Sequence, residues 1–402
     1  MNLTRRMFLG GLCTCSAGGL LACTPTDPGR PRLDAGIGGQ SDLSPRNQPG
    51  QRHGTDADPD AGMRETFEGM ERRLQASRYR VREAKVNAYV GGIVQRMAGE
   101  FASDIRTYIV RVPDFNATQA PNGMMQVWTG LLVRCTNESQ MAAVLGHEIG
   151  HYTRAHGREG HNVRRRNADL GQALAMVLGA AGAPQLADIN NVLLTASSFG
   201  YNRENERESD EIGIRLLAEH GLSPIEAARN WENITTEFEA RGLPRSQSLL
   251  FSTHPSDEER TEHLRRRAGE LPPGEAHAAR YRDGISEIRE YIFEEQIRTG
   301  VHASTIVIGD RWLAEFPGDG LALYAKGEAL RLRAKTGDDE AAAAALDAAI
   351  RDTNTPANAW RGYGLLRRKL GQEAEARELL TEYLRRAPNA PDRDLVRRSL
   401  AG

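Results

Sequence analysis

Apolar residues recur every three or four positions along most of this chain, which is the spacing of one face of an α-helix. The pattern predicts helices over residues 63–101, 137–155 and 202–220. Residues 170–183 are also apolar and rich in alanine and glycine, but 14 residues are too few to cross a membrane comfortably, so a buried helix is predicted there. The chain is therefore predicted to be mainly helical.

Strand-like patterns occupy only two short segments. Residues 107–112, "TYIVRV", are rich in β-branched side chains and are followed by Pro113, which ends a strand. Residues 121–123, "PNG", predict a turn, and residues 124–128 predict a second short strand. A small sheet among helices gives the expected fold class of the first part of the chain, α+β with helices dominant.

The C-terminal third carries a repeated helical pattern. Residues 358–390 match the 34-residue tetratricopeptide unit, with the expected offsets at Trp360, Gly364, Gly371, Ala376, Leu380, Tyr383 and Pro388. Gly327 precedes Gly364 by one repeat plus three residues, and Pro317 marks the end of a weaker unit still earlier. These residues predict an all-α repeat array, with an unrelated helical bundle as the alternative.

The repeats are too few to form a stable array alone. Each helical pair leaves an apolar face uncovered, and about three units are needed to bury a shared core, whereas about two and a half are recognisable here. The array is therefore predicted to dock on the preceding domain. Such arrays hold peptides or partner helices, so recruitment of a protein substrate or of an assembly machine is expected.

The first residues indicate an export signal. Arg5 and Arg6 precede an apolar stretch, as in a twin-arginine signal, and residues 20–23, "LLAC", resemble a bacterial lipobox in which Cys23 is lipidated. The alternative is an ordinary cleaved signal with a chance cysteine. Residues 24–62 are rich in Pro, Gly, Asp and Ser and predict a flexible tether. The protein is thus expected to be a periplasmic lipoprotein, on the outer membrane if the cell has one.

Composition narrows the class of protein further. The chain has 402 residues, of which 39% are hydrophobic and 26% charged, with a formal net charge of −2. This is globular composition, and the near-neutral balance gives no support for a nucleic-acid partner. Of four cysteines only Cys135 lies beyond the first 23 residues, so no disulfide can form within the rest of the chain. The fold must depend on packing or on a metal.

Residues 144–152, "VLGHEIGHY", place two histidines four positions apart in a predicted helix. Positions i and i+4 share a helix face, so His147 and His151 can direct two imidazoles at one metal ion. Glu148, beside the first histidine, is placed to take a proton from zinc-bound water. The alternative is two histidines satisfied in a helix–helix contact. His156 falls off the ligand face and is predicted to be structural.

Residues 202–213, "NRENERESDEIG", supply a matching second element. Glu206 can provide a third, carboxylate ligand. Asp210, one turn further, can accept the free ring N–H of a ligand histidine, most plainly His147. The alternative is a solvated acidic helix face, which is the prediction for Glu204, Glu208 and Glu211.

Four motifs in order give this chain a family resemblance. They are "FNATQAPNGMMQVWTGLL", "GHEIGHYTRAH", "NRENERESD" and "FSTHPSDEER", within residues 66–264. Together they resemble the gluzincin peptidases of the CAAX prenyl endopeptidase and HtpX type. With the export signal, the lipobox and the repeats, the chain resembles the periplasmic protease-chaperones of that family. Asn122 and Asn202 depart from the usual glycine and serine, and the transmembrane helices of the HtpX type are absent from the sequence.

The resemblance implies one zinc ion (Zn2+) per chain and Glu148 as general base, with the ligands His147, His151 and Glu206. It also implies an exposed edge strand along which extended substrate lies, formed by Met124, Met125, Gln126 and Val127. His254, in "STHP", corresponds to a family histidine with two alternative roles. It either donates to the oxyanion of the tetrahedral intermediate or occupies the open zinc position and silences the enzyme. The alternative, from the residues alone, is that His254 is a surface-loop histidine.

These patterns lead to one expected function and its alternatives. The expected domains are an export signal (1–23), a tether (24–62), a zinc metallopeptidase domain (63–270) and a tetratricopeptide-like repeat domain (271–402). The expected function is a zinc metalloendopeptidase that hydrolyses misfolded or misassembled envelope proteins, with zinc-bound water activated by Glu148. The alternative is a chaperone or assembly-factor scaffold with minor or autoinhibited proteolysis, and a non-peptidase zinc hydrolase shares only the metal chemistry. Expected partners are extended protein substrates, an outer-membrane assembly machine, and the membrane through Cys23.

Overall fold

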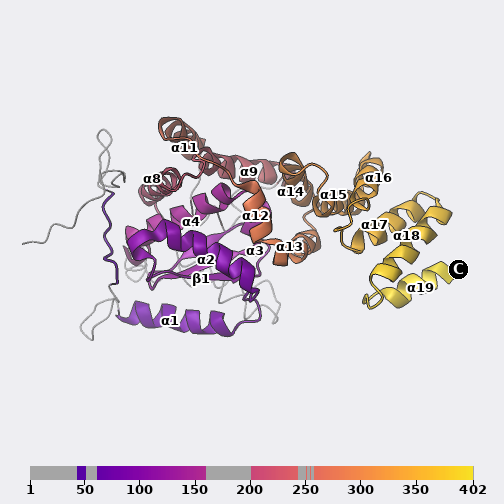
Figure 1. Cartoon of the computed structure of the whole chain (residues 1–402), viewed down its shortest axis with the longest axis horizontal. Coiled ribbons are helices and arrows are strands. Elements are labelled where there is room, and N and C mark those ends of the chain that lie inside the picture. The colour runs from indigo at the N-terminus through magenta and orange to yellow at the C-terminus, as the bar shows by residue number, and fades with distance from the viewer. Residues whose placement is uncertain are drawn as a thin grey trace, which may run out of the picture. The chain divides into compact units, whose positions relative to one another are not determined.

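The structure, a computed structural model, describes residues 43–50, 61–159, 201–242, 250, 254 and 258–401. The predicted export signal, Cys23 and the helix predicted at 170–183 lie outside these residues. Helices dominate the described part of the chain (Figure 1). This confirms the predicted fold class, a mainly α protein with a small sheet followed by a helical region.

The helices before residue 271 form the framework of the candidate site. Their bounds are α1 (Ala61–Ala76), α2 (Ala84–Ala98), η1 (a 3-10 turn, Gly99–Phe101), α3 (Thr129–Arg134), α4 (Glu138–Thr153), α8 (Arg203–Glu219), α9 (Ile225–Arg241) and α11 (Glu258–Glu270). The segment predicted as helical over 63–101 is thus two helices separated at residues 77–83. Asn137 caps α4 by accepting from the Gln140 backbone N–H, and Asn202 caps α8 in the same way from Asn205.

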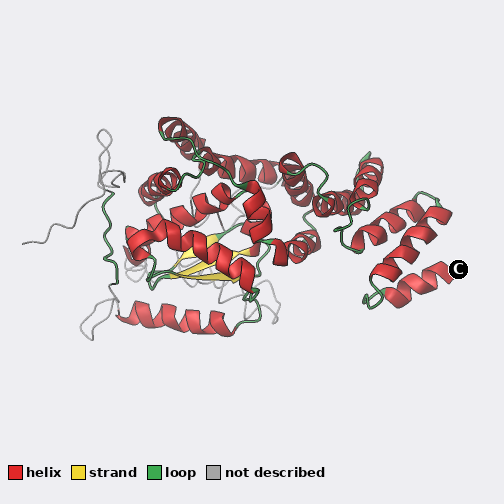
Figure 2. Cartoon of the chain, viewed as in Figure 1, coloured by secondary structure: helices red, strands yellow, loops and turns green. Residues whose placement is uncertain are grey.

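The sheet has three strands in the order β1–β3–β2 (Figure 2). They are β1 (Arg106–Val110), β2 (Ala117–Gln119) and β3 (Met124–Trp128), with β1 parallel and β2 antiparallel to β3. The strand predicted over 124–128 therefore forms with the predicted bounds, but it is the central strand. At three residues, β2 is too short to give a periodic signal in the sequence.

The prediction that Met124, Met125, Gln126 and Val127 form an exposed substrate edge is therefore wrong. Strands pair with β3 on both sides, and all five of its residues are buried. Met124 and Trp128 pack in the cluster that contains Phe67 of α1, whereas Met125 and Val127 pack in the core shared with α2 and α4. Both faces and both edges of β3 are thus occupied, and β2 is an edge strand of this sheet.

The helices after residue 271 are arranged mostly in antiparallel pairs (Figure 1). Their bounds are α12 (Ala278–Gly284), α13 (Ser286–Arg298), α14 (His302–Glu315), α15 (Gly320–Arg333), α16 (Asp338–Ala349), α17 (Asn358–Lys369), α18 (Glu373–Arg386) and α19 (Arg393–Ala401). A Cβ at Gly327 would lie 2.7 Å from Leu346 Cγ, and a Cβ at Gly364 would lie 2.8 Å from Leu380 Cγ. The two glycines that mark the predicted repeat thus occupy equivalent helix crossings, α15 with α16 and α17 with α18.

The C-terminal helices dock on the first domain, as predicted from the small number of repeats. Helix α13 packs on α2 and α3, and α14 packs on α9. One buried apolar cluster continues from Val81 to Val396, and Arg111 forms a salt bridge with Glu295 across the contact. The helices after residue 271 therefore share a buried apolar core with the helices before it.

Residues 43–50 lie within the predicted tether but are bound to the C-terminus of α4. The backbone N–H groups of Arg46 and Asn47 donate to the Thr153 carbonyl oxygen over 2.8 and 3.0 Å, and Asn47 is 5% exposed. Flexibility is therefore the wrong prediction for this short stretch. The last carbonyls of a helix need partners, and a polar segment can satisfy them without any apolar signal in the sequence.

Candidate metal centre

Helices α4 and α8 cross at close range because small residues line their contact. A Cβ at Gly150 would lie 2.9 Å from Ser209 Cα, and a Cβ at Gly146 would lie 3.2 Å from Gly213 Cα. Gly213 is equally restricted, since a Cβ there would lie 3.0 Å from the His147 backbone nitrogen. The two backbones are thus almost in contact, and the side chains beside these glycines are brought to one point.

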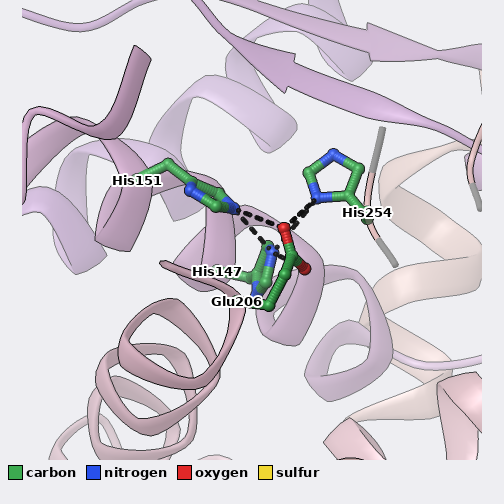
Figure 3. A group of neighbouring side chains, drawn as sticks. All are labelled: His147, His151, Glu206 and His254. Atoms are coloured by element: carbon green, nitrogen blue, oxygen red, sulfur yellow. Dashed lines mark hydrogen bonds and ion pairs between the residues drawn. The ribbon is translucent and has the colours of Figure 1, made fainter. Parts of the chain in front are cut away.

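The converging side chains are the two histidines of α4, a glutamate of α8 and a histidine from beyond α9 (Figure 3). One donor atom from each of His147, His151, Glu206 and His254 lies within 4.8 Å of the others. The Nε2 atoms of His147 and His151 are 3.0 Å apart, and each lies 3.4 Å from a carboxylate oxygen of Glu206. Two imidazole nitrogens and a carboxylate are donors that zinc accepts, so the residues fit that metal.

Asp210 and Arg260 form a charged layer behind these side chains. Asp210 Oδ1 lies 2.9 Å from His147 Nδ1, on the ring edge away from the other donors. Arg260 donates to both oxygens of Asp210 over 2.8 Å and lies 2.7 Å from Glu206 Oε2. Its guanidinium stacks over Trp231 at 4.5 Å. Arg260 therefore holds the carboxylates of Glu206 and Asp210 in place, and the sequence did not indicate this partner.

A second layer lies behind His151. Its Nδ1 lies 3.0 Å from His156 Nδ1, and His156 Nε2 lies 3.0 Å from Glu208 Oε2, which also accepts from Arg154. His156 follows the end of α4, where Ala155 has a φ of 58°, so helical spacing could not place it. His156 thus has a structural contact, as predicted, and that contact is with His151 itself.

The prediction of a solvated acidic face on α8 holds only for Glu204. Glu208 and Glu211 are buried, at 7% and 5% exposure. Arg154 binds Glu208 on the side of α4, whereas Arg267 of α11 binds Glu211 on the other side. Helix α8 packs against α4 on one side and α11 on the other. Arginines from these two sides therefore bind the two carboxylates, which were predicted to be exposed to solvent.

His254 is buried at 3% exposure, so the surface-loop alternative is wrong. Its Nδ1 lies 3.1 Å from Glu206 Oε1 and 3.4 Å from His147 Nε2. Its Nε2 lies 3.6 Å from Glu148 Oε1. His254 therefore stands among the donors and beside Glu148 at the same time.

Glu148 lies beside the candidate metal ligands, and only 2% of the residue is exposed. Burial raises its pKa, although His254 and His147 lie close enough to oppose the shift. One of its oxygens, Oε2, has no hydrogen-bond partner among the described residues. A buried carboxylate with an unused oxygen beside a metal site is suited to hold a water molecule.

The donors themselves carry opposite charges without a metal. Burial alone would lower the pKa of His147, but the carboxylates of Glu206 and Asp210 outweigh it and raise the pKa to about 10. The pKa of Glu206 lies well below its usual value because His254, Arg260 and His147 outweigh the burial that would raise it. Since a ligand histidine must be neutral, binding of a metal ion by His147 would displace a proton.

An apolar pocket opens beside Glu148. Its walls come from the β1–β2 connection, α4, α8, α9 and α11, and include Phe115, Val144, Ile214, Trp231, Ile234 and Leu264. His147, Glu148 and His254 also line it. The pocket can therefore hold an apolar side chain of a bound peptide next to His147, Glu148 and His254.

Comparison with known proteins identifies the part of the chain that carries this site. Residues 84–268 match the peptidase family M48. This match covers less than half of the chain. This agrees with the resemblance to gluzincin peptidases seen in the sequence, and it includes the donors and Glu148.

The proteins to which this chain is similar include three of Escherichia coli. Metalloprotease LoiP of strain K12 is 30% identical over 154 residues, which are 38% of this chain and 59% of LoiP. The beta-barrel assembly-enhancing protease of O157:H7 is 28% identical over 212 residues, 50% of this chain and 43% of that protein. Metalloprotease YcaL of K12 is 25% identical over 217 residues, 53% of this chain and 81% of YcaL. The chain thus matches less than two thirds of the length of the first two.

Proposed function

We propose that this protein is a zinc-dependent metalloendopeptidase of the cell envelope that cleaves misfolded or misassembled envelope proteins. The convergence of His147, His151 and Glu206 within hydrogen-bonding range of one another, next to the buried Glu148, carries this proposal. The M48 match and the metalloprotease names of the relatives support it. A non-peptidase hydrolase would need no M48 framework.

The proposed chemistry assigns a role to each group. His147, His151 and Glu206 would hold one zinc ion, which supplies a Lewis acid for the peptide carbonyl and for water. Glu148 accepts the proton of the attacking water and returns it to the leaving amine, a role that its raised pKa suits. Asp210 holds the ring of His147 by its Nδ1, and Arg260 holds Asp210.

Substrate would bind along β2 rather than along β3. In the described residues β2 has a single neighbouring strand, so its other edge could pair with an extended peptide once that edge is exposed, since its three residues are buried here. Strand β2 also lies against α4, and the Gln119 backbone hydrogen-bonds Glu148. A peptide added to β2 would therefore pass next to the general base.

His254 is proposed to close the site in the resting protein. Its Nδ1 lies among the candidate metal ligands, which supports the role of a fourth ligand. His254→Ala should therefore raise casein cleavage or self-cleavage. A fall in activity would favour the oxyanion role, and an unchanged rate would discard both roles.

The remaining proposals concern location and partners. The relative named as a beta-barrel assembly-enhancing protease supports an envelope setting. Export by the twin-arginine route and a lipid anchor on Cys23 are proposed from the sequence alone. In the part of the chain that the structure describes, no helix has the length and apolarity needed to cross a membrane. The paired helices after residue 271 are proposed to be a tetratricopeptide-like array that recruits substrate or an assembly machine.

Metal content and cleavage together test the proposed function. Purified wild-type protein should contain one zinc per chain and cleave a denatured protein, whereas Glu206→Ala should lose both. Glu148→Gln should keep the zinc and lose cleavage, since only the proton acceptor is removed. If Glu148→Gln fully complements an envelope-stress defect, the scaffold or chaperone alternative is the main function.

A further inference from the structure

Three successive carbonyl groups at the C-terminus of α3 are each bound by a side chain from the C-terminal helices. Tyr281 Oη donates to the Leu132 oxygen over 2.6 Å, and Trp312 Nε1 donates to the Val133 oxygen over 2.8 Å. Arg311 Nη1 donates to the Arg134 oxygen over 3.0 Å. The last carbonyls of a helix lack partners within it, so α12 and α14 supply the cap of α3.

These donors cannot easily be replaced by water. Tyr281 and Trp312 are fully buried, at 0% exposure. Arg311 also donates to the Asn233 oxygen of α9 over 3.0 Å, so it ties α3 to α9. Removing a donor would leave a buried carbonyl oxygen without a hydrogen-bond partner, which destabilises this end of α3.

The capped end of α3 leads directly into the helix that carries the metal donors. Only residues 135–137 separate α3 from α4. The first turn of α4 is held by the same C-terminal region, because the buried Glu138 forms a salt bridge with Arg280 of α12. The Ser139 hydroxyl donates to the Glu275 carbonyl oxygen over 2.8 Å. Both sides of the α3–α4 bend are therefore fixed by residues 275–312.

A shift at this bend would move the candidate metal ligands that α4 carries. His147 lies nine residues along α4 from Glu138, about 14 Å at 1.5 Å per residue, and a packed helix moves as a rod. Functional constellations tolerate displacements of only about 0.5 Å. Small changes at the cap of α3 are thus sufficient to separate two imidazoles from a carboxylate on another helix.

We propose that Tyr281, Arg311 and Trp312 are positioning residues of the metal centre, so that α12 and α14 belong to the working unit of the peptidase. The family match ends at residue 268, and the sequence placed the domain boundary at 270, before all three residues. The proposal rests on the proposed function for its effect on cleavage, but its effect on metal binding does not depend on cleavage.

The test uses the full chain with the smallest possible changes. Tyr281→Phe and Trp312→Phe each remove one donor and keep an aromatic ring, and Tyr363→Phe is the matched control. Tyr363 is a buried tyrosine (2% exposed) of α17, and its hydroxyl contacts Arg367 of the same helix. The measurements are Co2+ titration with visible absorption spectra, and hydrogen exchange of the metal-free protein.

The two variants should bind Co2+ about tenfold more weakly, which is about 1.4 kcal/mol, because a displaced α4 must return to its position when the metal binds. Their Co2+ spectra should change, and the amides of residues 135–147 should exchange faster, with no such change in Tyr363→Phe. If Trp312→Phe does not fold, Tyr281→Phe alone decides.

Wild-type spectra, affinity and exchange in Tyr281→Phe, with only a lower melting temperature, would overturn the proposal. A wild-type protein that binds Co2+ and cleaves nothing would instead remove the proposed function. The Co2+ spectra of the variants would then still decide whether Tyr281 and Trp312 position the metal centre.

Discussion

Two helix crossings in this protein use glycine for different purposes. At the α4–α8 crossing, a Cβ on Gly150 or Gly213 would meet the backbone of the other helix, at 2.9 and 3.0 Å. At the α17–α18 crossing, a Cβ on Gly364 would first meet the Leu380 side chain, at 2.8 Å. A leucine can change its rotamer, whereas a helix backbone carries every side chain with it when it moves.

The same contrast holds for charge. Beside the α4–α8 crossing, Glu206 and Asp210 are buried and share Arg260. In α18, Glu382 pairs with Arg385 at side-chain exposures of 30% and 68%. Buried pairs are costly to break, and exposed pairs contribute little. The α4–α8 crossing is therefore held by buried charge pairs in a fixed arrangement. The α17–α18 crossing is held by apolar side chains that can change their rotamers.

Loss of Arg260 should have the largest effect on stability. Arg260→Ala leaves two buried carboxylates without their cation, so the free energy of unfolding of the metal-free protein should fall by about 3–5 kcal/mol. Urea denaturation measures this change. Arg385→Ala, in an exposed pair, is the matched control and should leave the midpoint unchanged. Equal midpoints for both variants would contradict the contrast between the regions.

Gly150→Ala should be next, with its effect mainly on the metal site. The new methyl group pushes α8 away from α4, and misplacement of about 1 Å costs on the order of a hundredfold in activity. Zinc affinity and cleavage rate should fall together. Rates within a few-fold of wild type would show that the backbones can separate without disturbing the donors.

Gly364→Ala should have a smaller effect, and only on stability. Leu380 must repack around the new methyl group, which costs about 1–2 kcal/mol. Thermal unfolding should register the change, while zinc content and peptide cleavage stay at wild-type values. A loss of zinc in this variant would show that the second crossing is also coupled to the site.

The smallest effect concerns pH. Burial alone would raise the pKa of Glu211, but hydrogen bonds from His263, Arg267 and Arg215 outweigh it and lower the pKa to about 2. Because the folded pKa lies below the usual 4.5, this carboxylate stabilises the fold above about pH 4.5. The stabilisation is lost as pH falls towards 2. Glu211→Gln should cost about 1 kcal/mol at pH 7, with the difference from wild type shrinking in acid.

Glu382→Gln sharpens this test. A hydrogen bond from Arg385 also lowers the pKa of Glu382 to about 2, but this pair is partly exposed. Water screens it, so the variant should unfold like wild type at every pH. Denaturation curves between pH 2 and 7 compare the two. A larger effect for Glu382 than for Glu211 would reverse the expected order.

Much of the candidate site was visible in the sequence because its spacing is local. His147 and His151 share a face of one helix, and Glu206 and Asp210 share a face of another, whatever surrounds them. The bounds of β3 and the caps at Asn137 and Asn202 are local in the same sense. Matching glycines at 327 and 364 likewise anticipated two equivalent helix crossings.

Other features depended on which surfaces meet. The sequence showed β3 as a strand, but its central place required β2, a three-residue strand without a periodic signal. The sequence predicted that Glu208 and Glu211 are exposed to solvent, because it does not show that Arg154 and Arg267, more than 50 residues away, pair with them. Arg260, His156 and the cap of α3 are further examples of partners distant in the chain or beyond a helix end.

By itself, then, the sequence determined the helices, the helix faces that carry the candidate metal ligands, and the similarity of residues 84–268 to peptidase family M48. Only the tertiary structure decided the order of the strands, the burial of His254, the arginines that neutralise α8 and the capping of α3 by Tyr281, Arg311 and Trp312. The physical reason is range. Backbone hydrogen bonding sets side-chain direction within a few residues, whereas burial and charge pairing arise only when distant segments exclude water between them.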